Sequence, residues 1–433
     1  MTKTLIRFSA VVASLLASVY PLPWQTIQAK ASQVTSGMLN QPKALMSISL
    51  DGSNQAASDG TMDRGNPQRT GVYKTKGLHQ LSSVLWKSSK LFDTLITKRD
   101  GRLRIIDLPV GAGLGVGAAL IYQEEDSYSE YYSDIPFVFN TMVYFTLYTG
   151  HAHLAALDAK TGTMKWHFKR DLTVFSYPAI ADDTVYFGGS DGNFYALDCK
   201  TGQEQWRFTK KGTAFSLSSP ILLNGIAYFG SSDGSLYALD TKTRQPNWVF
   251  KAKSFLRTPA FADETIYVTS GEGYLYAVDM KTGQEKWKLK LRARSPILAN
   301  GLIYCDDREA MYAIDSRTGT LKWKRSPAGK LGTSLAFADG MICFGGWRDS
   351  MYAMDAETGL EKWKFKTSGP VDSPVIADGV VYFGSVGTLY AVDAKTGQQK
   401  FTIDAPKASL SSPAIANGVI YFVRDDGHLY AIH

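Results

Sequence analysis

The sequence predicts an all-β protein, an eight-bladed β-propeller whose blades are four-stranded antiparallel sheets. Three observations lead to this prediction. One phrase recurs with a period near 40 residues, each period holds four short strand-like runs, and no segment after residue 80 carries a long apolar stripe at helical spacing. Four strands in about 40 residues is the size of one propeller blade.

The repeated phrase is seen in "LYAVDMKTGQEKWKLK", residues 275–290, and its aspartate marks each copy. The marker aspartates are Asp158, Asp198, Asp240, Asp279, Asp315, Asp355 and Asp393, and His433 ends an eighth copy 40 residues after the last of them. A spacing this regular indicates an array of like structural units.

Each unit contains four short runs that are rich in β-branched and aromatic residues. In residues 371–403 these runs are "SPVIA", "VVYFGS", "TLYAVD" and "QKFTI", each interrupted by Gly, Asp or Asn. Such runs between turn-forming residues are typical of short strands joined by tight turns.

The turn between the third and fourth strands has its own signature, Asp-x-x-Thr-Gly. Its glycine can adopt a left-handed conformation at little cost, and its aspartate can accept hydrogen bonds from backbone amides. Arg244 stands in place of this glycine in the third copy, so we expect a different turn there. One tryptophan opens each fourth strand, and we expect it to pack between neighbouring blades: Trp166, Trp206, Trp248, Trp287, Trp323 and Trp363.

The eighth copy stops after its third strand. The segment "LSSVLWKSS", residues 81–89, places Trp86 in a fourth-strand setting without the preceding turn. We therefore expect an N-terminal strand to complete the last blade, which closes the ring and removes two exposed sheet edges.

The repeat, with its tryptophan at the fourth strand, resembles the quinoprotein-type (PQQ-like) propeller repeat. The segment "MDRGNPQRTGVY", residues 62–73, resembles the lead-in of many such proteins. The resemblance covers residues 62–433 and implies the propeller fold and indole packing between blades. It leaves function open, since this scaffold serves quinone dehydrogenases, assembly factors and sensor domains.

The N-terminus reads as an export signal. Lys3 and Arg7 precede the apolar stretch "FSAVVASLLASVYPLPW", and small residues follow, so we expect cleavage after Ala31. An uncleaved anchor is the alternative, although the apolar run is short for a membrane span. Residues 32–80 are polar and predict a flexible linker with the lead-in, before a propeller at 81–433.

Charge and cysteine content narrow the class of protein. Removing three basic residues with the signal leaves 44 basic and 40 acidic side chains, a net charge of +4. For an exported protein this balance argues against nucleic acid as a partner. Cys199, Cys305 and Cys343 do not form a disulfide framework, and no cysteine follows the signal to carry a lipid. His151 and His153 have no identifiable third ligand, so no metal site is predicted.

Function is expected where the copies differ, in the loops from strand two to three and from strand four to the next blade. These loops share one face of a propeller, which we call the loop face. Trp347 belongs to no repeat position and lies beside Arg348, a pair that protein interfaces favour. The candidate binding residues on this face are Trp347, Arg348, Asp307, Arg308, Arg257, Arg294, Arg424 and Asp425.

One insertion interrupts the repeat, at about residues 89–132. It contains "RIIDLPVGAGLGVGAALIY" and the acidic, Tyr-rich "QEEDSYSEYYSD". We expect a glycine-rich hairpin or lid beside the mouth of the channel.

Three functions remain open from the sequence. The first is a non-catalytic propeller in the periplasm or outside the cell, monomeric and not an integral membrane protein, that binds a protein partner or envelope component. This reading resembles the outer-membrane barrel-assembly (BamB-type) propellers. The second is a PQQ-dependent dehydrogenase with Ca²⁺, for which no calcium ligands can be matched; the third is a binder of envelope polymers or sugars. The first predicts no cofactor and no catalytic residues.

Overall fold

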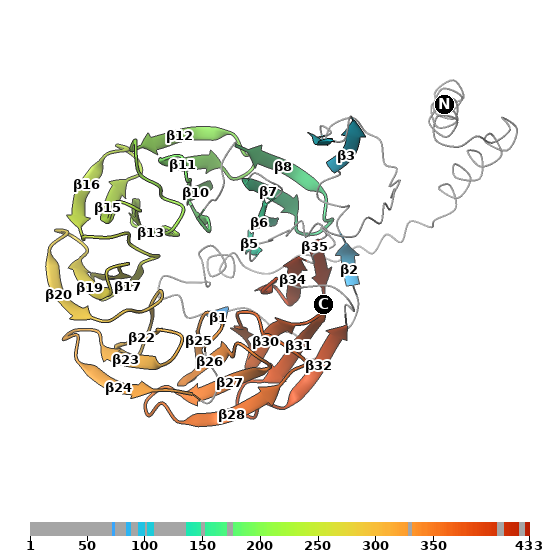
Figure 1. The fold of residues 1–433 in the computed structure, drawn as a ribbon. Coiled ribbons are helices and arrows are strands. Elements are labelled where there is room, and N and C mark those ends of the chain that lie inside the picture. The colour runs from blue at the N-terminus through green and yellow to red at the C-terminus, as the bar shows by residue number, and fades with distance from the viewer. Residues whose placement is uncertain are drawn as a thin grey trace, which may run out of the picture. The chain divides into compact units, whose positions relative to one another are not determined.

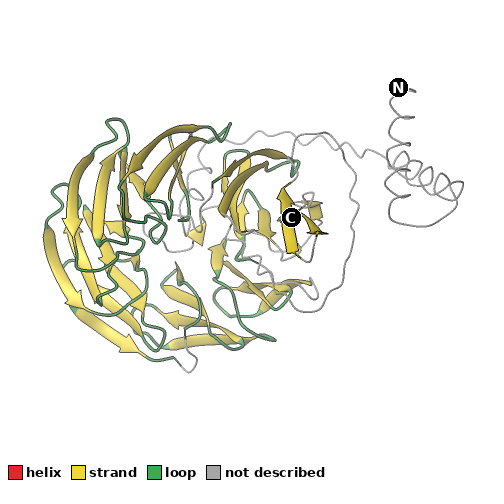
Figure 2. Cartoon of the chain, turned by 45° about the horizontal axis from the view of Figure 1, so that its top comes forward, coloured by secondary structure: helices red, strands yellow, loops and turns green. Residues whose placement is uncertain are grey.

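The computed structural model describes residues 72–73, 84–87, 94–99, 102–107, 136–148, 152–170, 176–327, 331–404, 411–423 and 429–433. These residues form strands and loops and no helix (Figure 2). The predicted signal peptide at 1–31 lies outside the described residues, as does most of the predicted linker at 32–80.

Eight four-stranded antiparallel blades form a ring, with the fourth strands on its outer rim (Figure 1). Blade 1 contains β5 (Phe137–Phe139), β6 (Met142–Tyr148), β7 (Ala152–Asp158) and β8 (Met164–Lys169); blade 2 contains β9 (Ala179–Ala181), β10 (Thr184–Gly188), β11 (Asn193–Asp198) and β12 (Glu204–Thr209); and blade 3 contains β13 (Ile221–Leu223), β14 (Ile226–Gly230), β15 (Ser235–Asp240) and β16 (Pro246–Lys251). Blade 4 contains β17 (Ala260–Ala262), β18 (Thr265–Thr269), β19 (Tyr274–Asp279) and β20 (Glu285–Lys290); blade 5 contains β21 (Ile297–Ala299), β22 (Leu302–Asp306), β23 (Met311–Asp315) and β24 (Leu321–Arg325); and blade 6 contains β25 (Ala336–Ala338), β26 (Met341–Gly345), β27 (Ser350–Asp355) and β28 (Glu361–Lys366). Blade 7 contains β29 (Val375–Ala377), β30 (Val380–Ser385), β31 (Thr388–Asp393) and β32 (Gln399–Asp404), and blade 8 contains β33 (Ala414–Ala416), β34 (Val419–Val423), β35 (Leu429–Ile432) and β2 (Val84–Lys87). The predicted fold class is confirmed.

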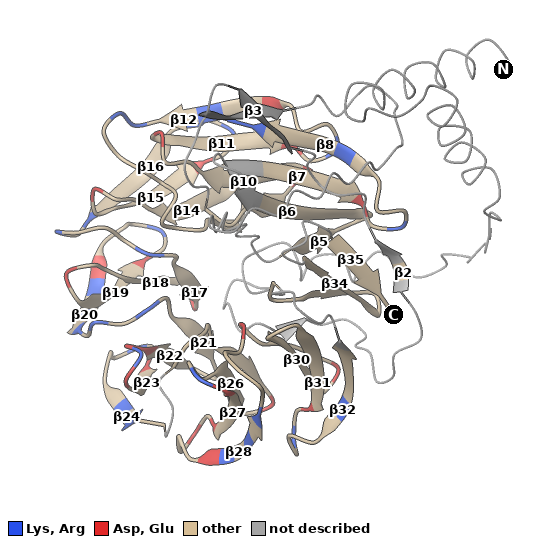
Figure 3. Ribbon diagram, turned by 45° about the vertical axis from the view of Figure 1, so that its right-hand side comes forward, with Lys and Arg blue, Asp and Glu red and all other residues tan. Residues whose placement is uncertain are grey.

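Burial follows the position of a strand within its blade. The second strands, such as β10, β18 and β26, are buried along their whole length because neighbouring blades cover both of their faces. The fourth strands alternate between partly buried and exposed residues, as in β12 and β16. Lys, Arg, Asp and Glu accordingly gather on the fourth strands and loops (Figure 3). Any function that depends on charged side chains is therefore expected on the outer rim or on the two faces of the ring.

The N-terminal strand closes the ring as predicted. β2 pairs antiparallel with β35, with Val84 opposite Ile432 and Trp86 opposite Ala431. The backbone of Trp86 thus occupies the expected fourth-strand place, while its indole lies outside what the structure describes.

A further N-terminal strand, β1 (Val72–Tyr73), was not predicted. It pairs in parallel with β29, the innermost strand of blade 7, with Val72 opposite Ile376 and Tyr73 opposite Ala377. Blade 7 is therefore a five-stranded sheet whose channel edge is covered by the lead-in (Figure 1). Parallel pairing over so few residues could not be read from the sequence, because two residues carry no periodicity.

The insertion contains a hairpin that precedes its glycine-rich stretch. β3 (Thr94–Arg99) and β4 (Arg102–Asp107) form a two-stranded antiparallel sheet, and Asp-Gly stands between them in the sequence. An Asp-Gly pair between two strand-like runs is a strong hairpin signal. The glycine-rich and Tyr-rich stretches that follow lie outside the described residues.

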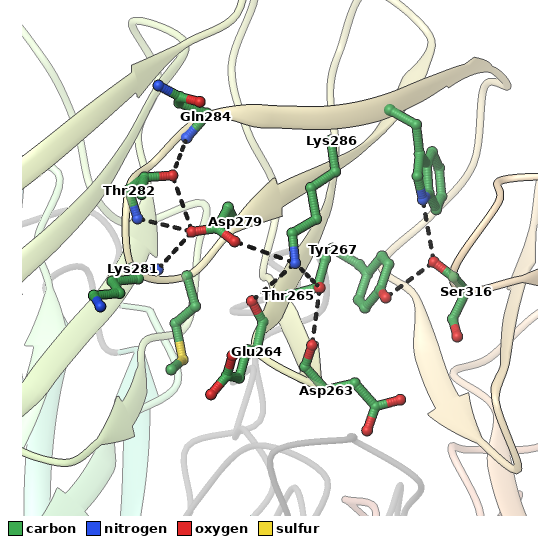
Figure 4. A network of polar contacts seen from close by, with 12 residues as sticks. Asp263, Glu264, Thr265, Tyr267, Asp279, Lys281, Thr282, Gln284, Lys286 and Ser316 are labelled. Atoms are coloured by element: carbon green, nitrogen blue, oxygen red, sulfur yellow. Dashed lines mark hydrogen bonds and ion pairs between the residues drawn. The ribbon is translucent and has the colours of Figure 1, made fainter.

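The repeated turn works as a cap on the end of the third strand. In blade 4 the Oδ1 atom of Asp279 accepts hydrogen bonds from the backbone amides of Lys281 (3.1 Å) and Thr282 (2.9 Å). Its other oxygen pairs with Nζ of Lys286 at 3.2 Å, and Lys286 also donates to Oγ1 of Thr265 at 2.9 Å (Figure 4). The turn is thereby tied to both the second and the fourth strand of its own blade.

The repeated tryptophan joins one blade to the next. The indole Nε1 of Trp287 in blade 4 donates to the carbonyl oxygen of Ser316 in blade 5 at 3.1 Å, and the hydroxyl of Tyr267 donates to the same oxygen at 3.0 Å (Figure 4). A Cβ atom added to Gly319 would lie 2.9 Å from the Trp287 ring, so the indole requires glycine in the facing turn. Equivalent indole bonds to the next blade are made by Trp166, Trp248, Trp323 and Trp363.

The expectation of a different turn at Arg244 was wrong. Arg244 adopts the same left-handed conformation as the glycines, with φ of 61°, and its amide donates to the carbonyl of Asp240 at 2.8 Å. What changes is the junction, because the guanidinium lies 5.9 Å from the centre of the Trp206 ring in the preceding blade. A cation–π contact between Arg244 and Trp206 thus replaces the glycine–indole contact that Gly319 makes with Trp287.

The cysteines are buried and free. Cys305 and Cys343 are fully buried in the blade cores, and burial raises the pKa of both thiols, that of Cys343 to about 12. They act as small apolar residues, as predicted.

Candidate functional site

The antiparallel order of each blade puts the loops from strand two to three and from strand four to the next blade on the loop face. Among the described residues, three large apolar side chains are exposed there: Leu217, Trp347 and Val386. Trp347 and Val386 stand on the same loop of adjacent blades, between the second and third strands. Leu217 and Val386 were not singled out from the sequence, since single apolar residues in loops carry no pattern.

Trp347 is the most prominent of these residues. Its side chain is 55% exposed, and the guanidinium of Arg308 lies 5.8 Å from the centre of its ring. Arg308 belongs to blade 5 and Trp347 to blade 6, so the pair bridges two blades. We expected the neighbouring Arg348 beside this ring, but the structure brings Arg308 there, while Arg348 is exposed.

The loop that carries Arg308 is held rigidly. Arg308 has φ of 78°, its amide donates to Oδ1 of Asp306 at 3.0 Å, and its carbonyl accepts from the amide of Leu331. A cation and an indole on a fixed backbone form a surface that loses little conformational entropy on binding.

Asp307 stabilises this loop through hydrogen bonds within the fold. Its carboxylate accepts hydrogen bonds from the hydroxyl of Tyr312 at 2.6 Å and from the amides of Glu309 and Ala310. Burial alone would raise the pKa of Asp307, but these hydrogen bonds hold it below its usual value.

Arg294 is likewise occupied within the fold. Its Nη2 and Nε atoms lie 2.7 Å and 2.8 Å from Oδ1 of Asp306, and Nη2 also donates to the carbonyl of Thr333 in blade 6 at 2.8 Å. Burial raises the pKa of Asp306, against the opposing effect of Arg294. This pair is a buried link between blades rather than a binding group.

Arg257 differs from Arg294, because no carboxylate among the described residues pairs with it. Its guanidinium lies 5.1 Å from the centre of the Phe255 ring, and its Nε atom is buried without a hydrogen-bond partner. Burial, and then the charges of Arg308, Arg294 and Arg292, lowers the pKa of Arg257. The loop face of blades 4 and 5 therefore carries a cluster of cations, defined by Arg257, Arg292 and Arg308, beside the exposed indole of Trp347.

Asp372 was missed by the sequence analysis. It stands just before β29 on the loop face, its amide donates to the carbonyl of Gly384, and burial raises the pKa of its carboxyl to about 7. Comparison of the repeats could have found it, because four of the eight copies carry Ser or Thr at this position.

Two candidates cannot be placed. Arg424 and Asp425 lie outside the described residues. Among the residues that are described, no group of three or more His, Cys, Asp and Glu side chains could hold a metal ion. No helix in the described part of the chain is long and apolar enough to span a membrane.

The fold and the repeat together define an eight-bladed propeller of the PQQ-like type. The model of one family matches residues 124–289, 232–337, 307–387 and 352–433, and its description is "Outer membrane protein assembly factor BamB". The chain belongs to this family, which confirms the resemblance noted in the sequence.

Solved structures with this fold serve different functions. BamB from Moraxella catarrhalis is 16% identical, with a TM-score of 0.57 over 69% of this chain and 94% of its own. The computationally designed Ika8 protein is 17% identical, with a TM-score of 0.60 over 70% and 96%. A europium-containing methanol dehydrogenase is 14% identical, with a TM-score of 0.65 over 85% and 89%. No curated protein sequence matches the chain.

Proposed function

We propose that this chain is an exported, non-catalytic propeller that binds a protein partner through its loop face. The observation that carries the proposal is the Trp347–Arg308 pair, an exposed indole under a guanidinium on a rigid loop. Trp and Arg are the residues most enriched among those that dominate binding energy at protein interfaces. The cations of Arg257 and Arg292 next to this pair would guide an acidic partner toward it.

Two further observations support this proposal. The family's description is that of an outer membrane protein assembly factor, and the N-terminal sequence has the features of an export signal. The two carboxylates near this pair are engaged within the fold, since Asp306 accepts hydrogen bonds from Arg294, and Asp307 accepts them from Tyr312 and Ala310.

Site-specific photo-crosslinking tests the proposal in cells that produce the protein. A photoreactive phenylalanine analogue replaces Trp347, and in a second strain it replaces Leu360, which is 60% exposed in a turn on the opposite face. We expect a discrete protein adduct from position 347 that is lost when Arg308 is changed to Glu, and no such adduct from position 360. Equal adducts from both faces, or none from position 347, would contradict the proposal.

The dehydrogenase alternative is examined with the purified chain. PQQ and Ca²⁺ are titrated while the melting temperature is followed, with an alcohol or an aldose and a dye as electron acceptor. We expect neither a saturable shift nor dye reduction. Saturable stabilisation with turnover would replace the binding function by a catalytic one.

A further inference from the structure

The loop face contains one position that recurs in blades 2 to 8, three residues before the start of the first strand. In blades 2, 3, 6 and 8 it is a hydroxyl residue that closes the end of the second strand. The hydroxyl oxygens of Ser176, Ser218, Thr333 and Ser411 accept the amides of Gly188, Gly230, Gly345 and Val423 at 2.7, 2.7, 2.8 and 3.0 Å. A neutral side chain is therefore sufficient for the fold at this position.

Blade 5 replaces the hydroxyl by Arg294 and supplies a carboxylate to match it. The residue at the end of its second strand is Asp306, where blades 2, 3 and 6 have glycine. The Asp306 side chain is 3% exposed and accepts both Nε and Nη2 of Arg294. The charge introduced at the recurring position is neutralised within the blade.

Blade 4 has the arginine without the carboxylate. Arg257 occupies the recurring position, and Thr269 stands where blade 5 has Asp306. The amide of Arg257 donates to the carbonyl of Thr269 at 3.0 Å, so the two residues are adjacent. Nε of Arg257 and Oγ1 of Thr269 are both buried, and neither has a hydrogen-bond partner among the described residues.

A buried guanidinium nitrogen without a hydrogen-bond partner is costly for the fold. Arg257 is partly buried, and Arg292, Arg294 and Arg308 add positive charge around it. Burying a polar group without a partner costs about 1–3 kcal/mol, and more for a charged group. Serine at the same position in blade 3 avoids this cost, so the fold does not require the arginine.

We propose that Arg257 binds a carboxylate group of a ligand, as Arg294 binds Asp306 in the next blade. The ring of Phe255 holds the guanidinium from one side, and Arg292 and Arg308 strengthen the attraction for an anion. Where the carboxylate belongs to an acidic side chain of a protein, this inference rests on the proposed function and names the chemistry of the partner. A small polycarboxylate presents the same group.

Three variants test the site, and each lowers the net charge by one unit. Arg257→Ser restores the hydroxyl of blade 3. Thr269→Asp keeps Arg257 but supplies the internal carboxylate of blade 5. Arg317→Ser removes an exposed arginine from a turn on the opposite face and is the matched control.

The probes are citrate, fluorescein-labelled hexaglutamate and the hexaglutamine analogue, titrated against the full chain by anisotropy and calorimetry at low salt. We expect hexaglutamate to bind and hexaglutamine not to bind. Arg257→Ser and Thr269→Asp should each lower the affinity for hexaglutamate at least about tenfold. Arg317→Ser should leave the affinity unchanged. If citrate displaces hexaglutamate, a small polycarboxylate is sufficient as the ligand. If citrate does not displace it, the ligand is an acidic segment of a protein.

Two results would overturn the inference. One is the absence of binding by either carboxylate probe at millimolar concentration. The other is an equal loss of affinity in all three variants, which would show general attraction to a basic surface. Thr269→Asp retains the arginine, so it still tests the site if Arg257→Ser fails to fold. Crosslinking from position 347 that persists in Arg257→Ser would leave the proposed function in place while removing this site.

Discussion

At the scale of single residues, one carbonyl oxygen joins the two blades at five of the junctions, where it accepts the indole N–H of the preceding blade. At three of these junctions the same oxygen also accepts a tyrosine hydroxyl from the preceding blade: Tyr144 and Trp166 of blade 1 on Cys199, Tyr267 and Trp287 of blade 4 on Ser316, and Tyr304 and Trp323 of blade 5 on Ala356. The tyrosine was not recognised from the sequence, because aromatic residues in buried strands are expected for packing alone.

Trp287→Phe and Trp206→Phe measure what the indole hydrogen bond contributes. Trp287 donates to Ser316, whereas the structure gives Trp206 no such bond within the described residues and places Arg244 over its ring. Both side chains are partly buried, so the loss of apolar contact is similar. We expect Trp287→Phe to lower the free energy of unfolding by about 1 kcal/mol more than Trp206→Phe. Equal losses in denaturant titrations would show that packing alone carries the junction.

Asp372→Ser tests the buried carboxyl at the recurring position of blade 7. Burial raises the pKa of Asp372 to about 7 in the folded state, above the usual value of an aspartate. Between the two pKa values the folded state binds more protons than the unfolded state, so the wild type loses stability as the pH rises through this range. Serine removes this loss and provides the hydroxyl that blades 2, 3, 6 and 8 have at this position.

The variant should therefore be more stable than the wild type at pH 8, by about 2 kcal/mol. The advantage should shrink steadily as the pH falls from 7 to below 3.8, where Asp372 is protonated in both states. Denaturant unfolding of both proteins at several pH values measures the difference. A constant difference across this range would mean that Asp372 ionises normally in the folded protein.

At the scale of elements, short N-terminal strands complete the ring. β2 supplies the fourth strand of blade 8, and β1 covers the channel edge of β29 in blade 7. Both remove sheet edges that would otherwise expose unpaired backbone groups.

Replacing Val84–Lys87 by a Gly-Ser segment of the same length should open blade 8. We expect the melting temperature to fall by about 5 °C or more. Hydrogen exchange should rise in β33, β34 and β35, which lose their fourth strand. The same replacement of Thr94–Arg99 in β3 is the control, since β3 pairs only with β4 among the described strands. Unchanged exchange in blade 8 would show that β2 is dispensable for closure.

At the scale of the whole molecule, the two faces differ in how closely their residues follow the repeat. One face carries the repeated turns, and five of the seven marker aspartates there pair with a lysine of the fourth strand: Asp158 with Lys165, Asp279 with Lys286, Asp315 with Lys322, Asp355 with Lys362 and Asp393 with Lys400. The loop face carries the residues that depart from the repeat, including Trp347, Arg257 and Asp372. Uniformity on one face and variation on the other are expected of a scaffold that presents a binding surface.

The sequence by itself determined the architecture. The period, the four strands of each blade, the capped turn and the closure by residues 81–89 could all be predicted, because each depends on local interactions that are repeated many times along the chain. A pattern that recurs many times is distinguished from a chance match. The loops in which the copies differ then indicated the loop face.

Only the tertiary structure decided which of the candidate residues are free to bind. Arg257 and Arg294 look alike in the sequence, yet Asp306 neutralises one and Thr269 leaves the other unpaired. Arg308 rather than Arg348 lies over Trp347, because the ring places loops of adjacent blades side by side. These pairings join residues 12 positions apart within one blade or 39 positions apart in adjacent blades, and each occurs once, so no periodic pattern records them. The physical reason is that charge and hydrogen-bond satisfaction depend on which groups meet in space, whereas strand formation depends on neighbours along the chain.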